Sequence, residues 1–491
     1  MSEEVPFTPL VIDGEFRPAS NNATFDIRNP YSGKIVGRSA AATSQDCKDA
    51  IEAASRAFKT WGEAHMYQRR DVLLKAADIL DTEAMRQKII TSVREETAAI
   101  DPMLFFNLKA ASDSMRDIAG MIQLLRGETF PSLRTGGHVI AQRKPVGVIL
   151  GISPWNAPIY LAIRAIGIPL ICGNTVILKS SEHTPRTQSI VVEALLEAGA
   201  PKGVVNYISM DRDQAPALTA EMIGNPLVRR INFTGSDRVG KIIAAEAAKY
   251  LKPCVFELGG KSPAVVLDDA DIAAAARAIV SSAVLHSGQV CMSTERVIVQ
   301  RKASEKLIPE ITRIMQSLKA GDPFTDPTAQ LSALFNENAA INVLGMIQQA
   351  KDEGADILVG DLKREGGVVQ PHLLTNVPVG SRMWERESFG PVTIIAVADT
   401  IDELVELANK SDYTLAAAVW TKDVNLALDV AGRIRSACTN INGPSMHIEA
   451  LRGHGGLGGA TGYGHFDVEN FTDLRMIVVH AAGQTAYPVV G

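Results

Sequence analysis

The sequence has 491 residues, of which 46% are hydrophobic and 21% charged, so the chain can bury a large core and should divide into two or three domains. Its net charge of −6 is spread along the chain, which argues against a nucleic-acid-binding surface and a basic membrane-binding patch. Residues 1–4 are acidic where a signal peptide would be basic, and the most apolar stretch, 161–178, is broken by Arg164, Gly167 and Pro169. We therefore expect no signal peptide and no membrane span.

The cysteines and histidines show none of the spacings that mark disulfide frameworks or metal sites. The five cysteines include no C-x-x-C pair and are odd in number, as expected of reduced thiols in a cytosol-like compartment. The nine histidines show no H-E-x-x-H spacing. We expect a cytoplasmic protein without a metal site.

The N-terminal part of the chain predicts strands followed by helices. Residues 8–40 read as short strands separated by turns. Residues 46–61 predict a helix, because Ala50, Ile51, Ala54, Phe58 and Trp61 fall on one stripe. Helical patterns then repeat over 69–126.

From about residue 139 the pattern changes to alternating strands and helices. Strands are expected at 146–152, 175–178, 204–209, 230–233 and 255–258. A second alternating series covers 263–442, and the two series meet near Leu258-Gly259-Gly260, where the glycines let the chain turn. This alternation predicts an α/β fold with two doubly wound parallel-sheet domains.

Cys291 lies at a junction that can expose its thiol. It follows an alanine-rich segment, 271–285, and precedes the β-branched run 297–299, with Gly288 opening the loop between them. A free cysteine is most often an inert buried residue. Together with Glu257 and Asn156, however, Cys291 supplies a nucleophile, a base and a polar amide.

Two strand ends suggest a nucleotide site, although no G-x-G-x-x-G motif is present. Residues 233–240 follow a predicted strand and open a helix, which can hold a phosphate, although taken alone the motif is better explained as an ordinary capped turn. Lys179 and Glu182 follow another strand, where they can bond ribose hydroxyls or simply be solvated. A carboxylate there repels a 2′-phosphate, which favours NAD over NADP.

Six motifs in order carry a family resemblance over nearly the whole chain. They are Pro154-Trp155-Asn156-Ala157-Pro158, Lys179-Ser180-Ser181-Glu182, Phe233-Thr234-Gly235-Ser236, Glu257-Leu258-Gly259-Gly260-Lys261, Gly288-Gln289-Val290-Cys291 and Glu387-Ser388-Phe389-Gly390-Pro391. This set resembles the NAD(P)-dependent aldehyde dehydrogenase superfamily, and most of all its salicylaldehyde and vanillin dehydrogenase branch.

The resemblance implies a domain plan. An NAD-binding domain is expected over 1–127 and 146–256, and a catalytic domain over 257–442. A small β oligomerisation flap is expected over 128–145 and 467–491, built from a hairpin near 136–144 and a strand near 475–479. The resemblance also implies a homodimer or homotetramer. The implied cofactor-binding residues are Ile152, Ser153, Pro154, Trp155, Lys179, Ser181, Glu182, Gly235, Ser236, Val239, Leu258, Gly259, Glu387 and Phe389.

The residue chemistry gives a mechanism for aldehyde oxidation. Cys291 as a thiolate would add to the carbonyl carbon, and the Asn156 amide with the Cys291 backbone N–H would bind the resulting oxyanion. Hydride transfer to NAD leaves a thioester, which water activated by Glu257 hydrolyses to the acid. Relatives that pass the acyl group to coenzyme A tend to lack this carboxylate.

The substrate prediction depends on the helix after Asn156. Ala157 is small, and Arg164 follows about two helical turns after Asn156, where it can stack on an aromatic ring and donate to an ortho hydroxyl. Tyr160 and Leu161 are assigned to the same pocket. We expect a small hydroxylated aromatic aldehyde as substrate. A structural salt bridge is the alternative role of Arg164.

Some alternatives remain open at this level. The alternative substrate classes are a broad range of aldehydes, aliphatic aldehydes and semialdehydes. The competing functions are coenzyme A acylation, cofactor-free thiol hydrolysis and a non-catalytic structural role. The family's usual Gly-Gly-x-Lys-x-Ser-Gly close is also altered, since residues 455–465 lack the lysine. That departure affects the expected loop at the substrate entrance.

Overall fold

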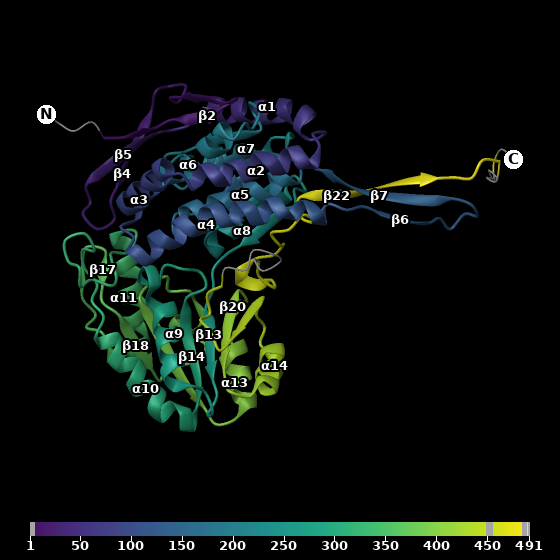
Figure 1. The fold of residues 1–491 in the computed structure, drawn as a ribbon. Helices are drawn as coiled ribbons and strands as arrows, with labels where there is room; N and C mark the ends of the chain where they lie inside the picture. The colour runs from purple at the N-terminus through teal and green to yellow at the C-terminus, as the bar shows by residue number, and fades with distance from the viewer. Residues whose placement is uncertain (1–4, 448–454, 484–488, 490–491) are drawn as a thin grey trace.

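The computed structural model describes residues 5–447, 455–483 and 489. Figure 1 shows two bodies, each built on a sheet, and a long arm of strands that extends from the first body. The described residues include no helix that has both the length and the apolar character needed to cross a membrane.

The first body contains a seven-stranded sheet with the order β12-β11-β8-β9-β10-β2-β3. The neighbouring strands β8 to β12 are parallel, whereas β2 and β3 add to one edge in antiparallel pairing. The sheet is therefore mixed at that edge. Its strands are β2 (Leu10–Ile12), β3 (Glu15–Arg17), β8 (Val148–Ile152), β9 (Thr175–Lys179), β10 (Val205–Ile208), β11 (Val228–Thr234) and β12 (Cys254–Glu257).

Helices cover both faces of this sheet because its strands are apolar on both sides. One face packs on α5 (Pro158–Ile171) and α6 (Pro185–Glu197), with α2 (Met66–Leu80), α3 (Glu83–Thr97) and α4 (Asp101–Gly120) in a further layer. The other face packs on α1 (Ser44–Trp61), α7 (Ala215–Gly224) and α8 (Asp237–Ala248). Helix α5 lies between the sheet and α4, so all its residues except Tyr160 are buried.

The second body repeats this arrangement with the strand order β15-β18-β19-β14-β13-β20-β21, in which only β15 is antiparallel to its neighbour. Its strands are β13 (Ser262–Val266), β14 (Thr294–Gln300), β15 (Asp356–Val359), β18 (His372–Thr375), β19 (Val392–Ala398), β20 (Ala416–Trp420) and β21 (Cys438–Ile441). Its helices are α9 (Ile272–Val284), α10 (Arg301–Gln316), α11 (Glu337–Asp352), α12 (Arg382–Glu385), α13 (Ile401–Asn409) and α14 (Val424–Arg433).

The arm is a three-stranded antiparallel sheet of β6 (Glu128–Pro131), β7 (His138–Pro145) and β22 (Thr472–Val479). Strand β22 pairs with β7 along its whole length, from Thr472 opposite Pro145 to Val479 opposite His138. Figure 1 shows these strands projecting together away from both bodies. Several large apolar side chains of β22 are exposed, namely Leu474, Met476, Ile477, Val478 and Val479.

Two minor sheets complete the described chain. Strands β1 (Phe7–Thr8), β4 (Thr24–Arg28) and β5 (Ile35–Ala40) form one, and β16 (Arg364–Glu365) with β17 (Val368–Val369) forms the other. The α/β fold with two sheets is confirmed. Helix α7 was not predicted; its Pro216 lies in the first turn, where proline is tolerated.

The altered glycine-rich segment near the C-terminus pairs with the edge of the first sheet. The Phe256 N–H donates to the Tyr463 carbonyl at 2.8 Å, and the Leu258 N–H donates to the Thr461 carbonyl at 2.9 Å. The Thr461 hydroxyl also donates to the Gly259 carbonyl at 3.0 Å. The segment therefore supports the turn between the two bodies without the missing lysine.

Candidate active site

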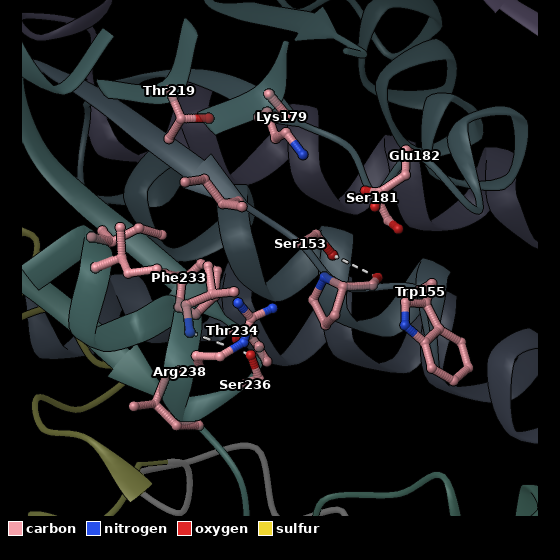
Figure 2. Close-up of a pocket in the computed structure, with 18 of the residues that line it drawn as sticks. Ser153, Trp155, Lys179, Ser181, Glu182, Thr219, Phe233, Thr234, Ser236 and Arg238 are labelled. Carbon is pink, nitrogen blue, oxygen red and sulfur yellow. Dashed lines mark hydrogen bonds between the residues drawn. The ribbon is translucent and has the colours of Figure 1, made fainter. Parts of the chain in front are cut away.

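A cavity of about 650 Å³ opens at the carboxyl ends of the parallel strands of the first sheet. This is the edge at which open α/β sheets bind ligands. In Figure 2, Trp155, Ser181 and Glu182 lie on one side of the cavity, Phe233, Ser236 and Arg238 lie on the other, and Ser153 lies between them.

All the cofactor-binding residues implied by the resemblance line this one cavity, as do Asn156, Leu161 and Cys291. They come from segments as distant in sequence as Ile152 and Phe389. The residues in this set are Ile152, Ser153, Pro154, Trp155, Lys179, Ser181, Glu182, Gly235, Ser236, Val239, Leu258, Gly259, Glu387 and Phe389. Their individual roles remain predictions.

The N-terminus of α8 provides a place for an anion. Ser236 caps the helix by accepting a hydrogen bond from the Val239 N–H at 3.4 Å, and both residues line the cavity. The free N–H groups and the positive end of the helix dipole favour a phosphate at this point.

The end of β9 places a lysine and a glutamate together in the cavity wall. Burial lowers the pKa of Lys179, and the Glu182 charge opposes this shift. Burial alone would raise the pKa of Glu182, but the charges of Lys179 and His183 outweigh it and the pKa is lowered. Glu182 is therefore ionised at neutral pH, as the expected ribose acceptor should be.

Buried Gln188 ties the ends of β8 and β9 together. Its side-chain amide donates to the Ser153 hydroxyl at 3.1 Å and to the Pro154 carbonyl at 2.6 Å. Its amide oxygen accepts from the Ser181 N–H at 2.9 Å. This bridge fixes the segment that carries Trp155 and Asn156 against the segment that carries Glu182.

The loop that carries Cys291 has an unusual backbone. After α9, the 3₁₀ turn η2 (Leu285–Gly288) contains His286, Ser287 and Gly288 at φ values of 52°, 58° and 78°. Glycine is required at the third position, because a Cβ there would lie 2.1 Å from the Gly390 carbonyl oxygen. The Ser287 hydroxyl donates to the Ser332 carbonyl at 2.7 Å, which anchors the turn.

The glycine pair after β12 lets three segments converge. A Cβ on Gly260 would lie 2.1 Å from the Cys291 carbonyl oxygen, and the Gly260 N–H donates to Glu387 Oε1 at 2.9 Å. Burial and the nearby Glu295 charge raise the pKa of Glu387 to about 8. Glu295 pairs with buried Lys261 at 2.5 Å and accepts from the Ser388 N–H at 3.0 Å, which fixes the Glu387 segment.

The reacting groups predicted from sequence are in contact. The Cys291 thiol donates to Glu257 Oε1 at 3.3 Å, and the Asn156 amide donates one hydrogen to the Gln289 carbonyl at 3.0 Å, beside the thiol loop. Burial and the Glu257 charge raise the pKa of Cys291 well above its usual value, with Arg164 opposing them. The raised pKa favours the protonated thiol at rest, with Glu257 in contact as a proton acceptor.

The four residues predicted to bind substrate divide into two groups. Leu161 lines the cavity, whereas Ala157, Tyr160 and Arg164 do not. Arg164 instead forms an ion pair with Glu257 and donates to the Thr234 hydroxyl at 3.0 Å. The structure thus shows the salt bridge that was the alternative for Arg164, with the guanidinium 4.3 Å from the centre of the Phe466 ring.

Sequence reasoning missed several residues of the site. Arg212 and Thr219 both line the cavity. They follow β10 at the same sheet edge, with Thr219 on α7, so the alternation of strands and helices could have indicated them. Phe335, whose ring stacks on Trp155 at 4.5 Å, lines the cavity, and Phe466 contacts Arg164; both lie on loops with no local signal. Within the described ranges, no group of three or more His, Cys, Asp or Glu side chains is arranged to hold a metal ion.

Comparison with known proteins agrees with this geometry. The model of the Aldehyde dehydrogenase family matches residues 16–477. A vanillin dehydrogenase of Pseudomonas fluorescens is 41% identical over 98% of this chain and 99% of its own length. A salicylaldehyde dehydrogenase of Pseudomonas putida is 38% identical over the same shares of both chains.

The structural comparison gives the same result. The crystal structure of a salicylaldehyde dehydrogenase from Pseudomonas putida G7 complexed with salicylaldehyde matches with a TM-score of 0.95 and 37% identity, over 98% of this chain and 100% of that one. The two-sheet fold therefore has its counterpart in a known enzyme. The chain belongs to the aldehyde dehydrogenase family.

Proposed function

We propose that this enzyme oxidises a hydroxylated aromatic aldehyde to the carboxylic acid with NAD. The observation that carries the proposal is the 3.3 Å contact between Cys291 Sγ and Glu257 Oε1, beside a cavity whose lining suits a dinucleotide. A nucleophile, a base and a cofactor site in one place are what aldehyde oxidation requires.

In the first step the Cys291 thiol adds to the aldehyde carbon while Glu257 takes the thiol proton. This assignment accounts for a partly buried thiol with a raised pKa, because the proton has an acceptor in hydrogen-bond contact. The second Asn156 amide hydrogen and the Cys291 backbone N–H would bind the oxyanion, since an amide has two hydrogens and Gln289 uses one.

The cavity residues fit a dinucleotide. The N-terminus of α8 would hold a phosphate, Lys179 and Glu182 a ribose, and Glu387 the ribose next to the reacting end. NAD bound there would accept the hydride from the thiohemiacetal carbon. Glu257 then releases the thiol proton to solvent, and its carboxylate activates the water that hydrolyses the thioester on Cys291 to the acid and the free thiol.

NAD is proposed over NADP because the ionised Glu182 repels a 2′-phosphate. Aromatic substrates are proposed because the relatives named above are a vanillin dehydrogenase and a salicylaldehyde dehydrogenase. The exposed apolar strand β22 supports a homodimer or homotetramer joined through the arm. We also propose a cytoplasmic location.

The test is the formation of reduced cofactor with a panel of vanillin, salicylaldehyde, benzaldehyde and short aliphatic aldehydes, each with NAD and with NADP. The proposal predicts the highest kcat/KM for hydroxylated aromatic aldehydes with NAD, and free acid as product. A preference for aliphatic aldehydes would contradict the substrate class. A requirement for coenzyme A, with thioester as the product, would contradict the hydrolytic role of Glu257.

A further inference from the structure

Helix α5 carries a single charged side chain in an otherwise apolar sequence, and that side chain is buried. Arg164 is 5% exposed and its partner Glu257, at the end of β12, is 2% exposed. A buried charge is costly unless it is paired and hydrogen-bonded, so each of these residues needs the other.

The position of the guanidinium is fixed from three directions. Its Nη2 pairs with Glu257 Oε2 and donates to the Thr234 hydroxyl on β11 at 3.0 Å. Its face lies 4.3 Å from the centre of the Phe466 ring, and the Tyr160 ring lies 5.7 Å away on its own helix. A side chain held in this way has little freedom to turn toward a substrate.

Because of the ion pair, the two carboxylate oxygens of Glu257 have different partners. Oε2 is taken by Arg164, which leaves Oε1 to accept from the Cys291 thiol at 3.3 Å. We propose that Arg164 is a positioning residue that holds the Glu257 carboxylate turned toward Cys291 and balances its charge, and that it does not bind the substrate. This inference rests on the proposed role of Glu257 as the base.

The inference makes a specific statement about coupling. If Arg164 acts only through Glu257, its removal must slow the same step that removal of Glu257 slows, and it must do nothing further when Glu257 is already gone. A residue that binds the substrate would instead raise KM for hydroxylated aromatic aldehydes, independently of Glu257.

The experiment is a double-mutant cycle of Arg164→Gln, Glu257→Gln and the double variant, with vanillin, benzaldehyde and a short aliphatic aldehyde. Rapid-mixing kinetics separate the burst of reduced cofactor from the steady release of acid. Since a general base contributes about 10²- to 10⁴-fold, we expect Glu257→Gln to slow acid release by at least about 100-fold. Arg164→Gln should slow it by roughly 10- to 100-fold with every aldehyde, with KM little changed.

Two further variants serve as controls. Arg164→Lys, which restores the charge but not the planar fork, should recover part of the lost rate. Arg230→Gln, which removes a part-buried arginine that pairs with Asp473 on β22 away from the cavity, should leave the rate unchanged. Thermal melting of each variant checks the fold, and the double variant replaces the charged pair by a neutral one.

The expected result is that Arg164→Gln has no further effect in the Glu257→Gln background. Multiplied losses, or a KM increase confined to hydroxylated aromatic aldehydes, would overturn the positioning role while leaving the proposed function intact. Wild-type acid release by Glu257→Gln would instead overturn the base role in the proposed function, and the inference with it.

Discussion

The two ends of the cavity are built in different ways. At the cofactor end, short contiguous segments after β8, β9 and β11 present backbone groups and a helix terminus. At the proposed reaction end, Cys291 lines the cavity and contacts Glu257, which pairs with Arg164; these three residues come from distant segments and are held by buried charges. The topology of the sheet is enough to bring the strand ends together, whereas a charge pair forms only when both of its residues are present.

Replacing the nucleophile should give the largest difference between the two ends, because the reaction is lost while cofactor binding is kept. Cys291→Ser should reduce aldehyde oxidation by at least about 10⁴-fold, because the hydroxyl is a far weaker nucleophile than the thiol. NAD affinity, measured by tryptophan fluorescence, should stay within about threefold of wild type. A parallel loss of cofactor binding would show that the ends are not independent.

Asn156 lies between the two ends, so its replacement tests which of them it serves. Asn156→Ala should lower kcat by about 10²- to 10³-fold, or roughly 3 kcal/mol, through loss of an oxyanion donor. Single-turnover kinetics should show slow acylation with KM for NAD little changed. If cofactor KM rises while the single-turnover rate holds, Asn156 belongs to the cofactor end.

The protonated thiol gives the reaction end a pH signature. Because burial and Glu257 raise the pKa of Cys291, its alkylation by iodoacetamide should accelerate steadily as the pH rises from about 7 to about 9. In Glu257→Gln the loss of negative charge lowers the thiol pKa, so alkylation at a given pH should be about tenfold faster. Peptide mass spectrometry measures it at Cys291 alone; an early plateau in the wild type would contradict the raised pKa.

The cofactor end should respond more weakly to pH, through Glu387. Its pKa of about 8 means that the carboxyl is mostly protonated at pH 7 and ionises above pH 8. An ionised carboxylate accepts ribose hydroxyls more strongly, so NAD affinity should rise through this range by roughly 1 kcal/mol, or about fivefold. Glu387→Gln should abolish the pH dependence in a binding titration, and a persistent slope would assign it to another group.

The same contrast explains how much the sequence predicted. The residues at the ends of β8, β9 and β11 could be identified because the alternation of strands and helices places them on one edge, and the motifs named them. The grouping of Cys291 with Glu257 was expected from the chemistry of the two residues. The protonation of the thiol was not, because it depends on how the folded chain encloses the sulfur.

Contacts between residues far apart in the sequence could not be predicted. Nothing near Arg164 in the sequence says that it faces Glu257, and Phe466 and Phe335 lie on loops without periodic pattern. Gln188 lies within a helix and belongs to none of the motifs, yet it holds two loops of the site together. Such contacts join segments through space and leave no local signal in either segment.

The most direct test of the account is the mass of the enzyme during turnover. Glu257→Gln is mixed with NAD and a hydroxylated aromatic aldehyde, quenched in acid and digested. The account predicts that the peptide containing Cys291 gains the mass of the aroyl group, and that the adduct is absent without NAD and in Cys291→Ser. Steady formation of acid and reduced cofactor with no adduct on Cys291 would contradict it.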